Sequence, residues 1–319
     1  MAPVRARILE LAGWAVAASV GALMLTQGLG LELARPVAVA QSLTPYAVVP
    51  TAVVAIVAAL GRRALLALVA GSIGASMLWL AAPLAFPPDR PATTGEPLRI
   101  ASVNLLYTND DVVAAADVLA DLDLDVVAFH EYTDEHARLL RCHRLARLLP
   151  HRTDPGGAAT GGMAIWSRLP FTDPAQRTAG GRTVDRVVEG PNGPVRVLAV
   201  HPITPIQSFE RWREALDRIA ERATGSPDPI VVVGDFNATW WHPAFRDLLA
   251  DADLADAHVT LGRGWSTSWP TDRSLPPFVR LDHALTDDRL AATAVEDVRI
   301  PGSDHEAVVV TVRPVAAGT

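Results

Sequence analysis

The chain has 319 residues and a formal net charge of −7, and this length allows either one large domain or two. The acidic balance disfavours general binding to polyanions such as nucleic acid, because like charges repel. The only cysteine, Cys142, excludes an internal disulfide, so the fold must be stable through its core alone.

Three long apolar stretches open the chain. Uncharged runs of 21, 26 and 25 residues lie between Glu10 and Glu32, between Arg35 and Arg62, and between Arg63 and Asp89. A helix rises about 1.5 Å per residue, so each run is long enough to cross a hydrocarbon layer of about 30 Å. We therefore predict three transmembrane helices in a membrane domain of residues 1–87.

Two features leave alternatives for these spans. The first run follows Arg5 and Arg7 and precedes Ala38-Val39-Ala40, which resembles a signal-peptide cleavage site. The run is longer than a signal peptide requires and two further spans follow it, which favours a retained helix. The second span is the weakest, because prolines crowd its start, and we expect its helix to begin near Pro45.

The loop charges give an orientation. Arginines flank the first span on its amino side and form the turn at Arg62 and Arg63, whereas the loop between the first two spans carries only Arg35. The positive-inside rule then places the amino terminus in the cytoplasm. We expect a multi-pass protein of the cell membrane whose residues after Phe86 are extracytoplasmic, beginning with a proline-rich linker, residues 88–98.

Residues 99–315 are predicted to form one α/β domain. From Pro88 onward there are 23 arginines and 33 acidic residues, a net charge of −10. Apolar runs typical of strands recur, and helical spacing of apolar residues is found in residues 111–122, 133–149 and 207–224. The strand-like runs are "RIASVNLL", "DVVAFHEY", "GGMAIWSRLPF", "TVDRVVE", "VRVLAVHP", "IVVVGDFN", "VRLDHAL" and "GSDHEAVVVTV".

Polar residues stand where several of these runs begin or end. Any one of them has an ordinary explanation, such as a turn, a helix cap or a solvated rim. Together they supply carboxylates, amides and histidines and no second cysteine. Hard divalent cations such as Mg²⁺ prefer oxygen ligands, and histidine moves protons near neutral pH. This combination suits metal-assisted hydrolysis of a phosphate ester.

The ordered motifs "SVNLL", "AFHE", "GMAIWSR", "AVHP", "GDFNAT", "LDHAL" and "GSDH" resemble the endonuclease/exonuclease/phosphatase superfamily from about Arg99 to Val312. The resemblance implies a four-layer α/β/β/α sandwich (DNase I-like) with the site at the common rim of two sheets. It also implies a metal-dependent phosphoesterase with Mg²⁺ or Mn²⁺ as its cofactor.

The resemblance assigns a role to each matching residue. Glu131 is the expected principal metal ligand, with Asn104 and Asp304 beside the metal. Asp235 is expected to orient or deprotonate the attacking water, and Asn237 to hold the scissile phosphate. The remaining expected catalytic residues are His201, which contacts the phosphate, His305, the terminal catalytic histidine, and Asp282, which holds the tautomer of His305.

Two positions depart from the motifs of many nuclease members. Leu106 stands where an acid is common, which weakens the case for a second metal position, and His130 stands where glutamine is common. Neither change removes the expected site.

The substrate is left to three hypotheses. Three spans followed by an outward-facing catalytic domain are similar to the actinobacterial teicoplanin-resistance membrane phosphatases, which implies a lipid phosphate or polyprenyl diphosphate in the bilayer. A membrane-tethered nuclease or other phosphodiesterase is the second hypothesis, and the acidic balance argues against it. A non-catalytic surface module is the third, and the complete residue set argues against that.

Overall fold

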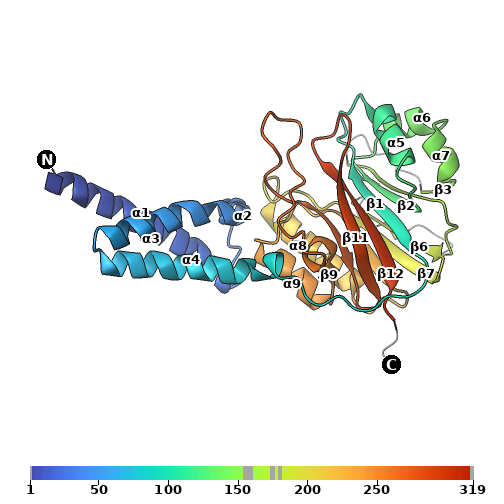
Figure 1. The fold of residues 1–319 in the computed structure, drawn as a ribbon. Coiled ribbons are helices and arrows are strands. Elements are labelled where there is room, and N and C mark those ends of the chain that lie inside the picture. The colour runs from blue at the N-terminus through green and yellow to red at the C-terminus, as the bar shows by residue number, and fades with distance from the viewer. Residues whose placement is uncertain (1, 154–160, 173–176, 179–181, 317–319) are drawn as a thin grey trace. The chain divides into compact units, whose positions relative to one another are not determined.

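The computed structural model describes residues 2–153, 161–172, 177–178 and 182–316, and it divides into two compact units (Figure 1). The first unit contains Met1–Pro83 and Trp240–Arg246, and the second contains Leu84–Thr239 and Asp247–Thr319.

The first unit is helical. Its helices are α1 (Ala2–Gly28), α2 (Arg35–Ser42), the 3₁₀ helix η1 (Thr44–Ala47), α3 (Val48–Leu60) and α4 (Ala64–Ala85). Among the described residues two helices, Val4–Gly28 and Ala64–Ala85, are long and apolar enough to cross a membrane. The second expected helix begins near Pro45 as predicted, at Thr44, and it is bent by 66° from the short helix α2 that precedes it, so the pair adds a third span only if it crosses as one. The bend adjoins Pro45, whose ring cannot fit inside a continuing helix.

The second unit contains two six-stranded sheets in the part of the chain that the structure describes (Figure 1). The first sheet has the order β11-β12-β1-β2-β4-β3 and the second β5-β6-β7-β8-β10-β9. Strands of the first sheet are β1 (Leu98–Asn104), β2 (Val126–His130), β3 (His151–Arg152), β4 (Met163–Ser167), β11 (Leu290–Arg299) and β12 (Glu306–Pro314). Strands of the second are β5 (Arg177–Thr178), β6 (Thr183–Gly190), β7 (Gly193–Val200), β8 (Ile230–Asp235), β9 (Ala255–Asp256) and β10 (Asp282–Thr286).

Side chains that alternate along the strands build the core. Inward residues of both sheets form one buried cluster that includes Ile100, Val197 and Val231. The opposite face of the first sheet, with Val103 and Phe129, packs in a second cluster with residues of α5 (Val112–Ala120), α6 (Asp134–Leu140) and α7 (Arg144–Leu148). The expected α/β fold with two sheets is thus present, and its arrangement is consistent with the DNase I-like sandwich.

Three more helices lie in the described part of the chain: α8 (Phe209–Ala223), α9 (Pro243–Asp251) and α10 (Ala257–Thr260). Helix α8 buries Trp212, whose indole Nε1 donates to the carbonyl oxygen of Phe236, just after β8 (3.3 Å). Helix α8 is therefore anchored to the end of a strand in the second sheet.

Two local predictions differ from the structure. The single helix expected over residues 133–149 is two helices, because His143 caps a new one: its Nδ1 accepts from the backbone N–H of Leu145 (3.1 Å). Strand β11 was not predicted, since its alanine-rich sequence has weak strand propensity and it pairs only as an edge.

The linker is fastened to the second unit by backbone hydrogen bonds. The N–H of Thr94 donates to Pro314 (3.0 Å), and the N–H of Ala316 donates to Ala92 (2.8 Å). The side chain of Asn192 both donates to and accepts from the backbone of Glu96 (2.7 and 2.9 Å). The expected linker is therefore hydrogen-bonded to the rest of the second unit at Ala92, Thr94 and Glu96.

Gly234 shows why glycine is needed in "VVVGD". A Cβ at this position would overlap the carbonyl of Val200 on the neighbouring strand β7. Glycine at position 234 of β8 therefore permits the close approach of the parallel strand β7. It does not form the sharp turn that its place before Asp235 suggests.

A buried ion pair in the second sheet gives a stability prediction. Arg196 binds Asp185 through two nitrogens (2.9 and 2.6 Å), and Arg222 adds a third contact (3.2 Å). Burial opposes ionisation of Asp185, but the hydrogen bonds and charges of both arginines outweigh it and lower its pKa. We expect Arg196→Met to destabilise the fold at pH 7 by about 3 kcal/mol, because it leaves a buried carboxylate with one partner.

The pH dependence has a defined sign. Because the folded pKa of Asp185 is depressed, its stabilisation is present above the unfolded pKa and is lost as pH falls through the folded pKa. The gap in melting temperature between wild type and Arg196→Met should therefore narrow below about pH 4. Thermal unfolding at pH 7 and pH 3 measures it. Arg138→Met, which breaks an exposed pair with Glu135, is the control and should change little; equal losses in both variants would contradict the prediction.

Candidate active site

The expected site residues lie at the rim where strands of both sheets end. Asn104 continues the inward-facing alternation of Ile100 on β1, and Asp235 continues that of Val231 on β8. Asp282 pairs directly with Asp235 across the antiparallel strands β10 and β8. Alternation along the strands therefore aims these three side chains into the space between the sheets.

Two site residues have a left-handed backbone although neither is glycine. Glu131 has φ 54° and Asn237 has φ 48°. Such conformations cost free energy and persist only where the surroundings hold them. The Oε2 of Glu131 accepts from the N–H of Tyr107 (3.0 Å), and the N–H of Asn237 donates to Asp235 Oδ1 (2.8 Å). The first bond holds the side chain of Glu131, and the second holds the backbone of Asn237 against the Asp235 carboxylate.

Carboxylate and amide groups meet around Asn104. Its Nδ2 lies 3.2 Å from Asp235 Oδ2 and 3.5 Å from Glu131 Oε1. The Nε2 of His201 lies 3.6 Å from the same oxygen of Asp235 and 3.9 Å from Glu131 Oε1. Four of the predicted residues, two at the ends of β1 and β8 and two just after β2 and β7, are therefore neighbours.

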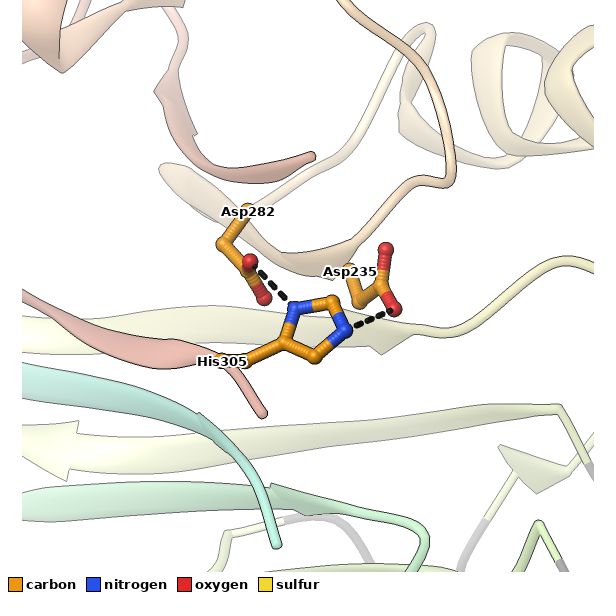
Figure 2. A group of neighbouring side chains, drawn as sticks. All are labelled: Asp235, Asp282 and His305. Atoms are coloured by element: carbon orange, nitrogen blue, oxygen red, sulfur yellow. Dashed lines mark hydrogen bonds and ion pairs between the residues drawn. The ribbon is translucent and has the colours of Figure 1, made fainter. Parts of the chain in front are cut away.

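His305 lies between two aspartates (Figure 2). Its Nδ1 donates to Asp282 Oδ2 (2.7 Å), and its Nε2 lies 3.7 Å from Asp235 Oδ2. Asp304 is joined to this group only loosely: its Oδ1 is 4.0 Å from His305 Nε2, and its Oδ2 accepts from the indole of Trp269 (3.0 Å). The structure thus brings the expected ligands Asn104 and Glu131 together and places Asp304 next to the histidine.

Burial and neighbouring charges shift the pKa values of this group. Burial of His305 would lower its pKa, but the charges of Asp282 and Asp235 outweigh burial and raise it to about 10. Burial is the largest influence on Asp235, and with the charges of Asp282 and Glu131 it raises the pKa of that carboxyl to about 7. His305 is therefore a cation at neutral pH, held beside a carboxyl that can gain or lose a proton.

His201 differs from His305. Burial, followed by the charge of Arg182, lowers the pKa of His201 to about 3, so its imidazole is neutral. His130, at the position where glutamine is common, is fully buried, and its Nε2 contacts Ser102 Oγ (2.8 Å). Burial lowers the pKa of His130 to about 3. The rim therefore contains one charged and two neutral imidazoles.

The side chains present fit a hard divalent cation. Glu131 is half-buried, so its oxygens are reachable, and its charge helps to raise the pKa of the Asp235 carboxyl. A cation would relieve this repulsion. Asp235, Asp282 and His305 also offer atoms within 4.8 Å of one another. Because Asp282 and His305 are hydrogen-bonded at 2.7 Å, we interpret that trio as an oriented histidine, which leaves the Glu131 carboxylate as the reachable metal ligand. The amide nitrogen of Asn104 faces Glu131, and its oxygen accepts from the N–H of Leu106 (3.0 Å).

Several supporting residues were given no role from the sequence. Ser268 donates to Asp282 Oδ2 (2.6 Å), and Ser303 donates to the Asn104 carbonyl (2.7 Å) while accepting from the N–H of His305 (3.0 Å). His283 contacts the carbonyl of Ala238 (3.0 Å), in the loop after Asp235. Ser303 and His283 lie inside predicted motifs, but Ser268 lies outside them, and only the fold brings it to Asp282.

Comparisons with known proteins agree with this arrangement. Residues 101–305 match the model of the endonuclease/exonuclease/phosphatase family. No curated protein sequence matches the chain. Among solved structures, D. rerio TDP2 complexed with single-strand DNA product has a TM-score of 0.56 and 15% identity, covering 68% of this chain and 99% of that one.

Two other structures are similar at the same level. The 3' phosphatase NExo from Neisseria, bound to a product DNA hairpin, has a TM-score of 0.54 and 19% identity, covering 67% of this chain and 98% of that one. A mutant beta toxin from Staphylococcus aureus with bound magnesium ions has a TM-score of 0.50 and 18% identity, covering 69% and 100%. The structural similarity to these proteins shows a shared fold. The family match extends over most of the second unit. The chain belongs to the endonuclease/exonuclease/phosphatase family.

Proposed function

We propose that the protein is a membrane-anchored phosphohydrolase that depends on a divalent metal and acts on a lipid phosphate or diphosphate, such as a polyprenyl diphosphate, outside the cytoplasm. The observation that carries the proposal is the convergence of Asn104, Glu131, Asp235 and His305 at one rim. Members of the family are phosphoesterases, and the chain retains the oxygen donors and the oriented histidine that such chemistry needs.

Each side chain has a proposed part in the reaction. Glu131, with Asn104 beside it, would hold a divalent cation, which would supply neutralisation of charge on the phosphoryl oxygens. Asp235, a buried carboxylate at the rim, takes the proton from the attacking water. The imidazolium of His305 donates a hydrogen bond to a phosphoryl oxygen and stabilises its developing charge, while Asp282 keeps the ring oriented.

Asn237 and His201 complete the set. One N–H of the Asn237 amide donates to the carbonyl of Pro202 (3.0 Å), which leaves the second N–H to hold the phosphate. The neutral imidazole of His201 can donate a single proton to the same group. Asp304, close to His305, is proposed to lie on the metal side as a weaker ligand.

The lipid substrate and the orientation rest on the amino-terminal region. Two helices of suitable length, and a bent pair that adds a third span if it crosses as one, support anchoring in a bilayer. Arginines on the amino side of the first span and in the Arg62–Arg63 turn support a cytoplasmic amino terminus. The same architecture underlies the likeness to the teicoplanin-resistance membrane phosphatases.

A tethered nuclease is the second candidate, because two similar structures, TDP2 and NExo, contain DNA products. The excess of acids after Pro88 weighs against it. A non-catalytic surface module would not need the ordered hydrogen bonds between Asp282, His305 and Ser268.

The test is a substrate panel on the full-length protein in detergent. We expect phosphate release from farnesyl diphosphate or phosphate with Mg²⁺, its loss with EDTA, and no nicking of plasmid DNA. Intact cells producing the protein should also hydrolyse a membrane-impermeant phosphoester added outside, and cells producing Glu131→Gln should not. Nicking without phosphate release from the lipid would overturn the lipid assignment, and activity only in opened cells would overturn the orientation.

A further inference from the structure

A cavity of about 510 Å³ in the second unit adjoins the candidate active site. It is lined by residues before β6, after β7 and on α8, among them Arg182, Pro202 and Arg211. The roles proposed above for the site residues leave it unused.

The cavity shares its wall with the site. The backbone N–H of His201 donates to the carbonyl of Arg182 (3.0 Å), and Pro202, which lines the cavity, accepts from the amide of Asn237 (3.0 Å). The charge of Arg182 also reaches the imidazole of His201, since it helps to lower the pKa of that ring. A group bound in the cavity would therefore be next to a phosphate held by Asn237 and His201.

The lining is strongly basic in an otherwise acidic region. Four arginines, residues 182, 211, 218 and 222, face one acid, Glu214. Arg218 pairs with Glu214 (3.4 Å) and Arg222 with Asp185 (3.2 Å). In the described part of the chain, Arg182 and Arg211 have no acidic partner. Residues from Pro88 onward carry a net charge of −10, so this local excess of positive charge is not a general property of the surface.

We propose that this arginine-lined cavity binds a second phosphoryl group while the first is held at the rim. The proposal rests on the proposed function and adds a second phosphoryl group next to the one held at the rim. Guanidinium groups bind phosphoryl oxygens through paired, charge-assisted hydrogen bonds. The cavity exceeds the volume of one phosphate, and Ile203 and Ile219 in its lining suit an apolar portion next to the charge. The second phosphoryl group is either the terminal phosphate of a diphosphate or the phosphodiester of an anionic lipid headgroup.

The test measures binding without turnover. Full-length protein in detergent is titrated with methylenediphosphonate, which carries two phosphonates and is not hydrolysed, and with inorganic phosphate, each with Mg²⁺. Arg211→Gln is expected to weaken diphosphonate binding about tenfold and to leave phosphate binding within about twofold, since one charge-assisted contact is lost. Arg213→Gln, on the same helix but outside the lining, is the control and should change neither.

The same titration in nanodiscs separates the two sources. If an anionic lipid headgroup fills the cavity, phosphatidylglycerol discs will weaken diphosphonate binding relative to phosphatidylcholine discs in the wild type and not in Arg211→Gln. If the source is a diphosphate, the two discs will give the same affinity. The proposal fails if Arg211→Gln loses both ligands equally or neither, or if Arg213→Gln behaves in the same way. If the protein hydrolyses lipid phosphates but Arg211→Gln binds diphosphonate as the wild type does, only the proposal for the cavity is wrong. If diphosphonate binding is selective but no substrate is hydrolysed, only the proposed function is wrong.

Discussion

Glu131→Gln is expected to lower kcat/KM for phosphoester hydrolysis by about 10³-fold with the fold intact. The substitution keeps the shape of the side chain and the left-handed backbone at this position, where φ is 54°. It removes one negative charge from the group that includes Asp235 and Asn104, and with it the proposed principal metal ligand. Losses of this size are typical when a group that stabilises charge in the transition state is removed.

The measurement is steady-state kinetics over a range of Mg²⁺ concentrations. The loss should be partly recovered at high Mg²⁺, because a weakened metal site is refilled by mass action. Glu135→Gln, an exposed position on α6, is the matched control and should keep full activity. Full activity of Glu131→Gln would place the metal elsewhere, with the acid and histidine trio of Asp235, Asp282 and His305 as the next candidate.

Asp282→Asn is expected to lower kcat by about 10³-fold with little change in KM. Asp282 Oδ2 accepts hydrogen bonds from both His305 (2.7 Å) and Ser268 (2.6 Å). An amide in its place can present an N–H to the ring, which favours the wrong tautomer and removes the charge that keeps His305 protonated. Removal of an orienting carboxylate in this way has large effects on kcat in hydrolytic enzymes.

Ser268→Ala provides the graded comparison. It removes one hydrogen bond from Asp282 and leaves the charge in place, so a loss of about tenfold is expected. Thermal unfolding of both variants shows whether the fold survives. A Ser268→Ala loss as large as that of Asp282→Asn would mean that hydrogen bonding to Asp282, and not its charge, positions His305.

Motif order and strand period predicted most of the second unit. The runs ending in Asn104 and Asp235 form strands, and their alternation with buried valines places both side chains between the sheets. Local patterns could not show what depends on distant partners. Ser268 reaches Asp282 only through the fold, and the role of Gly234 depends on strand β7 beside it.

Helix boundaries show the same limit. Apolar spacing through residues 133–149 fits one helix, but the ring of His143 satisfies a backbone donor and starts a second one. The prolines after Arg35 predict that the second apolar helix begins near Pro45, but they do not predict the short helix α2 before it or the 66° bend between the two. The assignment of Asp304 as a metal ligand came from motif position alone, and its contacts are with His305 and Trp269.

At Glu131 and Asn237 the left-handed backbone lowers stability while it holds a side chain at the site. Glycine at either of these positions would relax the main chain, so variants selected purely for heat resistance would tend to gain glycine beside the catalytic rim. Such variants would outlast the parent on heating and turn over less substrate, because the side chains lost are those that the strained backbone holds in place.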